Sequence, residues 1–372
     1  MLSVSAYDIV VFDMEDALVD RRSSECAAIS RAIDSYLTVL LGVRPEGGPV
    51  FTPDEVKAFM ESQGFDPDEE LLNVLLSVAL HTLTAEPSEA EFGVWDGREM
   101  LEAVRKSGQI QDSLGDLGRR KNVHELVKLL KQKGGGKRGF GRIRGLRNRW
   151  LALSEGHIMM DNLVNRILAE AYLGEELFHK EYGQNRQFMH DDGTIALERA
   201  WLEPQDMSYL RQRAGLATVT SRSQGEAQYV LQILGIGQYL DAVVGQGAGG
   251  MGMPDEAESA WIRTLGVGGG TAADYATRVG EAIERTRAQE GLESTVRVAY
   301  VGNCAVDSRG LPGLKDRYQL TPIGCVFGQD PKVLQVQKEK GAAVVAPDPR
   351  VLLKVLSERP RMRSDHGHGH GY

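Results

Sequence analysis

The sequence has few of the features that mark metal-bound, redox-active or membrane-spanning proteins. Its 372 residues include three cysteines, Cys26, Cys304 and Cys325, and no two have the short spacing of a zinc or redox motif. No apolar run approaches the roughly 20 residues that cross a bilayer. The N-terminal residues lead directly into a strand-like run, without the pattern of a secretory signal. We therefore expect a cytoplasmic protein with reduced thiols and no membrane partner.

Net positive charge is also lacking. The formal net charge is -9, which disfavours nucleic acid as a partner. The one basic cluster has only Phe140 and Trp150 as nearby aromatic residues, so stacked bases are not expected there either. Hydrophobic residues make up 42% and charged residues 26% of the chain. This composition is that of a globular protein, and the length predicts a main domain with one or two insertions.

Short apolar runs rich in β-branched residues recur along the chain and predict the strands of a sheet. The first run, 7–12, stands directly before Asp13, and the later runs are 216–219, 242–244, 296–301, 321–327 and 342–345. Helical patterns such as 224–234 alternate with these runs, which predicts an α/β fold with a doubly wound parallel sheet. Such sheets bind ligands at the carboxyl ends of their strands. Asp13, Thr220 and Asn303 each follow a predicted strand.

A long insertion is expected between the first strand and the rest of the sheet. Residues 1–22 and 200–357 form the predicted α/β core, and residues 23–199 form a predicted helical cap, with helical patterns at 21–41, 52–84 and 157–182. Within it, residues 86–151 are glycine-rich and basic, and 131–137 has the composition of a flexible loop. This basic segment is either a solvated surface or an arm that attracts anions.

The C-terminal tail is of low complexity. Residues 358–372 are predicted to be disordered, and they end in alternating histidine and glycine that could bind transition metals weakly.

The residues at the predicted strand ends resemble the motifs of one enzyme superfamily. The stretch 10–20, VVFDMEDALVD, resembles the first motif of the haloacid-dehalogenase (HAD)-like hydrolases, usually written FDxDGTLxD. The stretch 219–222, VTSR, resembles the second motif, and 300–307, YVGNCAVD, resembles the fourth, VGDxxxD. The strand entry 239–244 is also similar, and a cap after the first motif is typical of the helical-cap subfamily. The sequence is therefore identified as a HAD-like hydrolase with degenerate motifs.

This resemblance implies a set of site residues. Asp13 takes the position of the nucleophile that forms an aspartyl-phosphate, and Glu15 that of the group that transfers protons. Thr220, Ser221 and Arg222 are expected to bind the phosphate. Asp13, Asn303 and Asp307 are expected to hold Mg²⁺, which offsets the repulsion between a carboxylate and a phosphate.

Five residues depart from the family pattern. Glu15 replaces an aspartate, Asp16 a glycine, Ala17 a threonine, and Asn303 an aspartate. Asp16 and Ala17 are expected in a tight turn. In the third motif Met253 stands in the lysine position before Pro254, and no lysine occurs between Lys180 and Lys315. All five changes remove charge or precision that phosphoryl transfer needs.

Two functions follow, and the sequence leaves both open. The first is a phosphatase of a small phosphate monoester, weakened by these changes. The second is a catalytically inactive HAD-fold protein that binds a small anionic ligand or serves as a regulatory scaffold. A dehalogenase would need no metal, but no specific signal for it is present.

Overall fold

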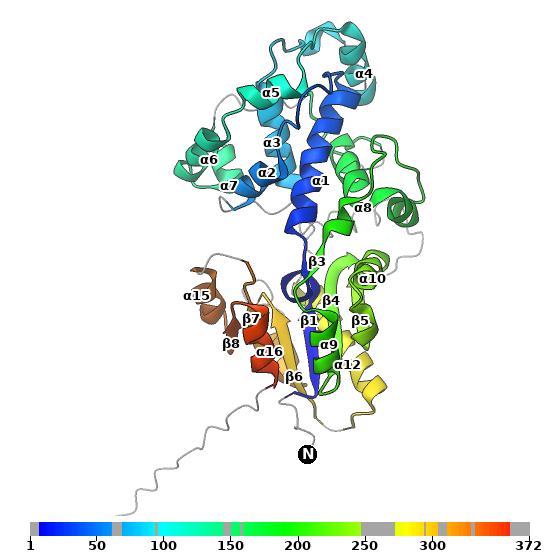
Figure 1. Ribbon diagram of the computed structural model, residues 1–372, viewed down its shortest axis with the longest axis vertical. Coiled ribbons are helices and arrows are strands. Elements are labelled where there is room, and N and C mark those ends of the chain that lie inside the picture. The colour runs from blue at the N-terminus through cyan, green and yellow to red at the C-terminus, as the bar shows by residue number, and fades with distance from the viewer. Residues whose placement is uncertain are drawn as a thin grey trace, which may run out of the picture.

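A single parallel sheet forms the base of the protein (Figure 1). The computed structural model describes residues 7–61, 69–93, 96–143, 150–156, 158, 160–246, 272–293, 295–303, 311–328 and 332–357. Its six parallel strands have the order β5-β4-β1-β6-β7-β8. They are β1 (Ile9–Asp13), β4 (Gly215–Ser223), β5 (Ala242–Gln246), β6 (Arg297–Gly302), β7 (Gln319–Cys325) and β8 (Val344–Ala346). All six predicted strand runs overlap these strands, and the predicted doubly wound α/β fold is confirmed.

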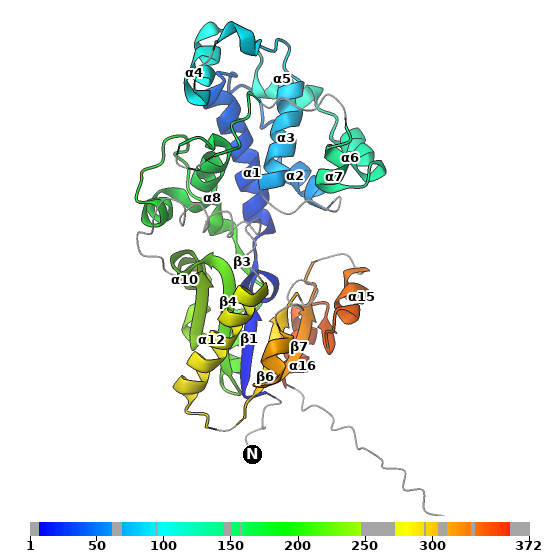
Figure 2. The same ribbon diagram turned by 180° about the vertical axis from the view of Figure 1, so that it is seen from behind.

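Helices cover both faces of the sheet. They are α9 (Pro204–Arg211), α10 (Gln224–Ile233), η5 (Gly237–Tyr239), α12 (Ala272–Glu290), α14 (Pro312–Lys315), α15 (Lys332–Glu339) and α16 (Pro349–Ser357). Helices α9 and α16 lie in front of the sheet in Figure 1, and α12 lies in front of it in Figure 2, where the molecule is seen from behind.

The first four residues of strand β1 are apolar because the strand is buried on both faces. Ile9 and Val11 pack in one hydrophobic cluster with Ile283 of α12, whereas Val10 and Phe12 belong to the larger cluster on the opposite face. Successive side chains of a strand point to opposite faces. A continuous β-branched run is therefore the expected sequence for the central strand of a covered parallel sheet.

The helices between residues 22 and 197 form a second body above the carboxyl edge of the sheet, here called the helical unit (Figure 1). They are α1 (Arg22–Ser35), η2 (Tyr36–Leu40), α2 (Pro53–Met60), α3 (Glu69–His81), η3 (Glu89–Glu91), α4 (Gly97–Ser107), α5 (Leu114–Arg120), α6 (Val123–Gln132), α7 (Gly136–Phe140), α8 (Leu163–Tyr182) and η4 (Thr194–Leu197). Thr52 begins α2 with a capping box completed by Glu55, and Pro53 occupies the first turn.

The basic segment differs from its prediction. It holds helices α4 to α7, and only 133–135 separate α6 from α7, so most of the predicted loop 131–137 is helical. Leu130 is fully buried, which anchors this basic hairpin to the rest of the unit. The glycine run that suggested a loop lies at the turn and at the start of α7, where Gly134, Gly135 and Gly136 each have a positive φ angle.

Two short strands connect the helical unit to the sheet. Strands β2 (Val19–Asp20) and β3 (Arg199–Ala200) pair in antiparallel fashion, and the Trp201 amide donates a hydrogen bond to the Leu18 carbonyl at 2.8 Å. The two connections therefore run side by side. Within the described residues, no helix is long and apolar enough to cross a membrane.

Candidate active site

Asp13 ends β1 at the carboxyl edge of the sheet. The residue is only 8% exposed. The neighbouring strand β6 ends in Gly302, where a Cβ atom would lie 2.7 Å from the Asp13 Cβ, so a glycine is required for this close approach. The sequence thus places a carboxylate in a tight, shielded position at the strand end.

The turn after Asp13 is wider than the tight turn expected from the sequence. Residues Met14–Leu18 form η1, one turn of π-helix. Asp13 caps this turn, because its Oδ1 accepts a hydrogen bond of 3.1 Å from the Asp16 amide. This wider turn accommodates Asp16 at the position where the resemblance expects a glycine.

The second oxygen of Asp13 also has a protein partner. The hydroxyl of Tyr275 in α12 donates to Asp13 Oδ2 and lies 3.0 Å from the hydroxyl of Tyr300. No lysine or arginine of the described residues forms an ion pair with Asp13. Burial, together with the negative charges of Asp16 and Glu15, raises the pKa of Asp13 well above its usual range.

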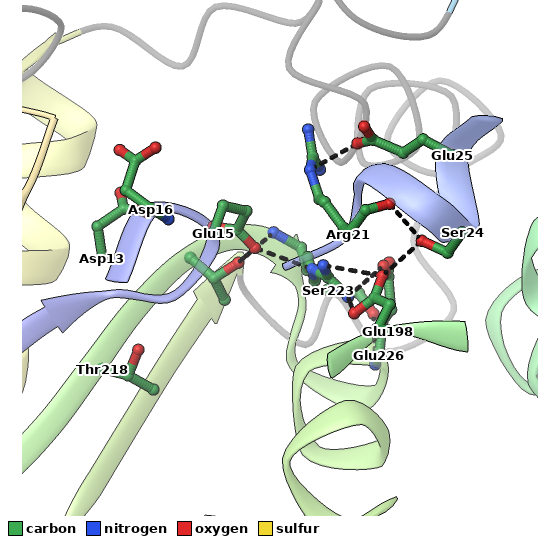
Figure 3. Close-up of polar contacts among 12 residues, drawn as sticks. Asp13, Glu15, Asp16, Arg21, Ser24, Glu25, Glu198, Thr218, Ser223 and Glu226 are labelled. Atoms are coloured by element: carbon green, nitrogen blue, oxygen red, sulfur yellow. Dashed lines mark hydrogen bonds and ion pairs between the residues drawn. The ribbon is translucent and has the colours of Figure 1, made fainter. Parts of the chain in front are cut away.

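Glu15 is held by two donors from β4. Its Oε1 accepts a hydrogen bond of 2.6 Å from the Thr220 hydroxyl and one of 2.8 Å from Arg222 Nε. Thr220 Oγ1 in turn accepts the Arg222 amide at 3.1 Å. Figure 3 shows the Glu15 side chain directed toward the side of Glu198 and Glu226, whereas the Asp16 carboxylate points away from them.

Arg222 is fully buried among carboxylates. Its guanidinium contacts Glu198 at 3.0 and 3.2 Å and Glu226 at 3.4 Å, in addition to Glu15. Burial raises the pKa of Glu226 to about 8. This enclosure leaves Arg222 no exposed surface with which to meet a phosphate, in contrast to the role expected from the sequence.

Asn303 follows β6 and has protein partners as well. Its backbone N–H donates to Asp16 Oδ2 at 2.9 Å, and its side-chain Oδ1 accepts a hydrogen bond of 2.7 Å from Gln337 Nε2. Ser221 is half-buried beside Thr220. Asp307 and Met253 lie outside the described residues, as do Cys304 and the C-terminal tail.

The structure therefore brings Asp13, Glu15, Thr220 and Asn303 together at the carboxyl edge of three adjacent strands, with Arg222 in contact with Glu15. Sequence reasoning missed Tyr275, Gln337, Glu198 and Glu226 as partners of these residues. None of the four carried a clear signal. Glu226 lies four residues after Arg222, but Arg222 belongs to strand β4 and not to the helix that contains Glu226.

Comparison with known proteins gives similarity in structure alone. No family model matches the chain, and no curated protein sequence matches it. A solved structural-genomics target, ZR25 of the Northeast Structural Genomics Consortium, is 15% identical with a TM-score of 0.54, covering 94% of this chain and 98% of its own.

Two further solved structures are titled by activity or family. Phosphatase Tt82 from Thermococcus thioreducens is 16% identical with a TM-score of 0.42, covering 87% of this chain and 93% of its own. A haloacid dehalogenase-like hydrolase from Streptococcus pneumoniae is 10% identical with a TM-score of 0.38, covering 95% and 99%. At 15% identity the likeness to the ZR25 target is one of fold alone.

Proposed function

We propose that this chain is a HAD-like hydrolase that cleaves a small phosphate monoester through an aspartyl-phosphate on Asp13. One observation carries the proposal: Asp13 lies at the carboxyl edge of the sheet beside the hydrogen-bonded pair of Glu15 and Thr220. Asp13 is aligned with Val219 of the adjacent strand β4, so Thr220 lies one residue beyond it. A nucleophile, a proton-transferring carboxylate and a hydroxyl are thus gathered at one edge.

The chemistry needs each of these groups in turn. The Asp13 carboxylate attacks phosphorus, and the bond to the ester oxygen breaks while the new acyl phosphate bond forms. Glu15 is the proposed group that passes a proton to the leaving oxygen and afterwards takes one from the water that hydrolyses the intermediate. Half-buried Ser221 is the proposed donor to the phosphoryl oxygens. Thr220 was expected to share this role, but it is fully buried and its hydroxyl donates to Glu15, so its proposed role is to hold Glu15.

The donor atoms near Asp13 suit Mg²⁺ in kind. Carboxylate and amide oxygens are the hard ligands that this ion prefers, and the negative charges crowded at Asp13 favour a cation. Asp13 and Asn303 are the described residues that would hold it, with Asp307 proposed as a third. A bound ion would neutralise negative charge where the carboxylate meets the phosphate.

Other features predict a weak site. Among the described residues no three histidine, cysteine, aspartate or glutamate side chains form a group that could hold a metal. Tyr275 and Gln337 already donate to Asp13 and Asn303, so an ion would compete with both donors. These two contacts favour the second candidate, a HAD-fold protein that binds an anionic ligand without turning it over.

The experiment is a phosphatase assay of the purified full chain with p-nitrophenyl phosphate and a panel of sugar, nucleotide and organic-acid phosphates. Each substrate is run with Mg²⁺ and with EDTA, for the wild type, for Asp13→Asn and for the surface control Asp191→Asn. We expect Mg²⁺-dependent release of phosphate that Asp13→Asn reduces at least about a thousandfold and the control leaves unchanged. Absence of turnover on the whole panel would select the binding function instead.

A further inference from the structure

The Arg222 guanidinium is the centre of a buried ionic cluster made of Arg222, Glu15, Glu198 and Glu226. Arg222 and Glu198 have no exposed side-chain surface, and Glu226 is only 3% exposed. The cluster is shown in Figure 3 between the turn after β1 and helix α10. Nothing in the proposed reaction uses Glu198 or Glu226 directly.

The members of the cluster come from both connections between the sheet and the helical unit. Glu15 belongs to η1, which leads through β2 into α1, and Glu198 directly precedes the returning strand β3. Glu198 also accepts hydrogen bonds from the hydroxyls of Tyr172 in α8 and Ser24 in α1. One guanidinium therefore links the turn that carries Glu15 to helices on the far side of the junction.

Stability alone does not account for such a cluster. Desolvating buried ions costs several kcal/mol for each ion, and apolar residues of similar volume often serve a fold equally well. What charge-assisted contacts supply is a defined geometry. Glu15 needs contacts that fix its geometry, because its side chain has one more rotatable bond than the aspartate usual at this position.

We propose that Arg222 is a positioning residue, which fixes the Glu15 carboxylate beside Thr220 and, through Glu198, ties its orientation to the junction with the helical unit. The catalytic consequence rests on the proposed function, whereas the mechanical link does not. A change in the contacts between the helical unit and Glu198 then shifts the Glu15 carboxylate.

The mechanical link is tested by hydrogen–deuterium exchange on the full chain. Glu198→Gln keeps the shape of the side chain and removes its charge, and Arg222→Met removes every ionic contact. Arg166→Met is the matched control, because Arg166 is equally buried and pairs with Glu170 at 3.0 Å inside the helical unit. The reporters are the hydrogen-bonded amides of Asp16, in the turn with Glu15, and of Trp201, after β3.

We expect both junction variants to speed exchange at Asp16 and Trp201 together by about tenfold, and Arg166→Met to leave both unchanged. Faster exchange at Trp201 alone in Glu198→Gln would overturn the link, because the turn with Glu15 would then be independent of Glu198. Equal effects in Arg166→Met would overturn it too, since any buried arginine would then suffice.

Turnover tests the positioning role separately. We expect Glu198→Gln to lower kcat about tenfold to a hundredfold, as a misplaced catalytic group does, with KM within about twofold of the wild type. An unchanged kcat beside an active wild type would overturn the positioning role. A wild type without turnover refutes the hydrolase, and the exchange measurement still decides whether the link exists.

Discussion

Two groups of carboxylates lie next to each other at the carboxyl edge of the sheet, and they are neutralised in different ways. Glu15, Glu198 and Glu226 surround the guanidinium of Arg222. Asp13 and Asp16 instead accept hydrogen bonds from neutral donors. The Tyr275 hydroxyl donates to Asp13, and the backbone N–H of Asn303 donates to Asp16. Arg222 is the cation of the first group, whereas the described donors to the second group are neutral. We infer that the ion pairs of the first group hold its carboxylates in a fixed geometry, whereas the carboxylates of the second group can respond to a bound ligand or ion.

Removing the cation of the first group should produce the largest effect. We expect Arg222→Met to lower the free energy of unfolding by about 3–5 kcal/mol, because it leaves buried carboxylates without a partner. Urea denaturation at neutral pH measures this loss. Lys106→Met is the contrast, because its pair with Glu102 is on the surface, and such pairs are worth about 0–1 kcal/mol. Similar losses in both variants would show that Arg222 is not the centre of a buried cluster.

A smaller effect, confined to high pH, is expected from Glu226. Its pKa is about 8 in the folded protein, because of burial, against an ordinary value of 4.5. A carboxyl group with a raised folded pKa stabilises most below its unfolded pKa, and this contribution is lost as the pH rises through the folded pKa.

The free energy of unfolding of the wild type should therefore fall between pH 5 and pH 8 relative to that of Glu226→Gln. One pKa unit corresponds to about 1.4 kcal/mol, so a relative loss of at least that size is expected in urea titrations at the two pH values. Parallel curves for the two proteins would mean that Glu226 is already ionised in the folded state.

The smallest effect concerns the second group and its response to Mg²⁺. Tyr275→Phe removes the hydroxyl that donates to Asp13. We expect the Mg²⁺ concentration for half-maximal thermal stabilisation to fall about threefold to tenfold, in line with one hydrogen bond of roughly 0.5–1.5 kcal/mol. Differential scanning fluorimetry measures it, with the exposed Tyr209→Phe as control. If Mg²⁺ stabilises neither the wild type nor Tyr275→Phe, this group does not bind the ion.

The strands of the sheet could be predicted from the sequence because the pattern that marks a strand lies within the strand itself. The central strands β1 and β6 bury both faces, so the β-branched runs 7–12 and 296–301 mark them, and Asp13, Thr220 and Asn303 follow from where such runs stop. The side-chain contacts of these three residues could not be predicted from the sequence. Tyr275 reaches Asp13 from 262 residues away, and Gln337 reaches Asn303 from 34.

Arg222 shows why residue type alone misled. A cation after a phosphate-binding motif suggests a phosphate ligand. Its environment, however, is set by Glu198, which the fold brings from before β3, and by Glu15 from the turn after β1. Burial of a side chain depends on which elements pack over it, and that information is distributed over the whole chain.

The pairing of β2 with β3 also has a consequence for engineering. Because the chain leaves the sheet and returns to it through adjacent strands, Leu18 and Trp201 are joined by a backbone hydrogen bond of 2.8 Å. An inserted domain whose first and last residues lie close together can be exchanged for another domain as a whole. A foreign helical domain with closely spaced termini could be grafted between these two residues without breaking any strand of the six-stranded sheet.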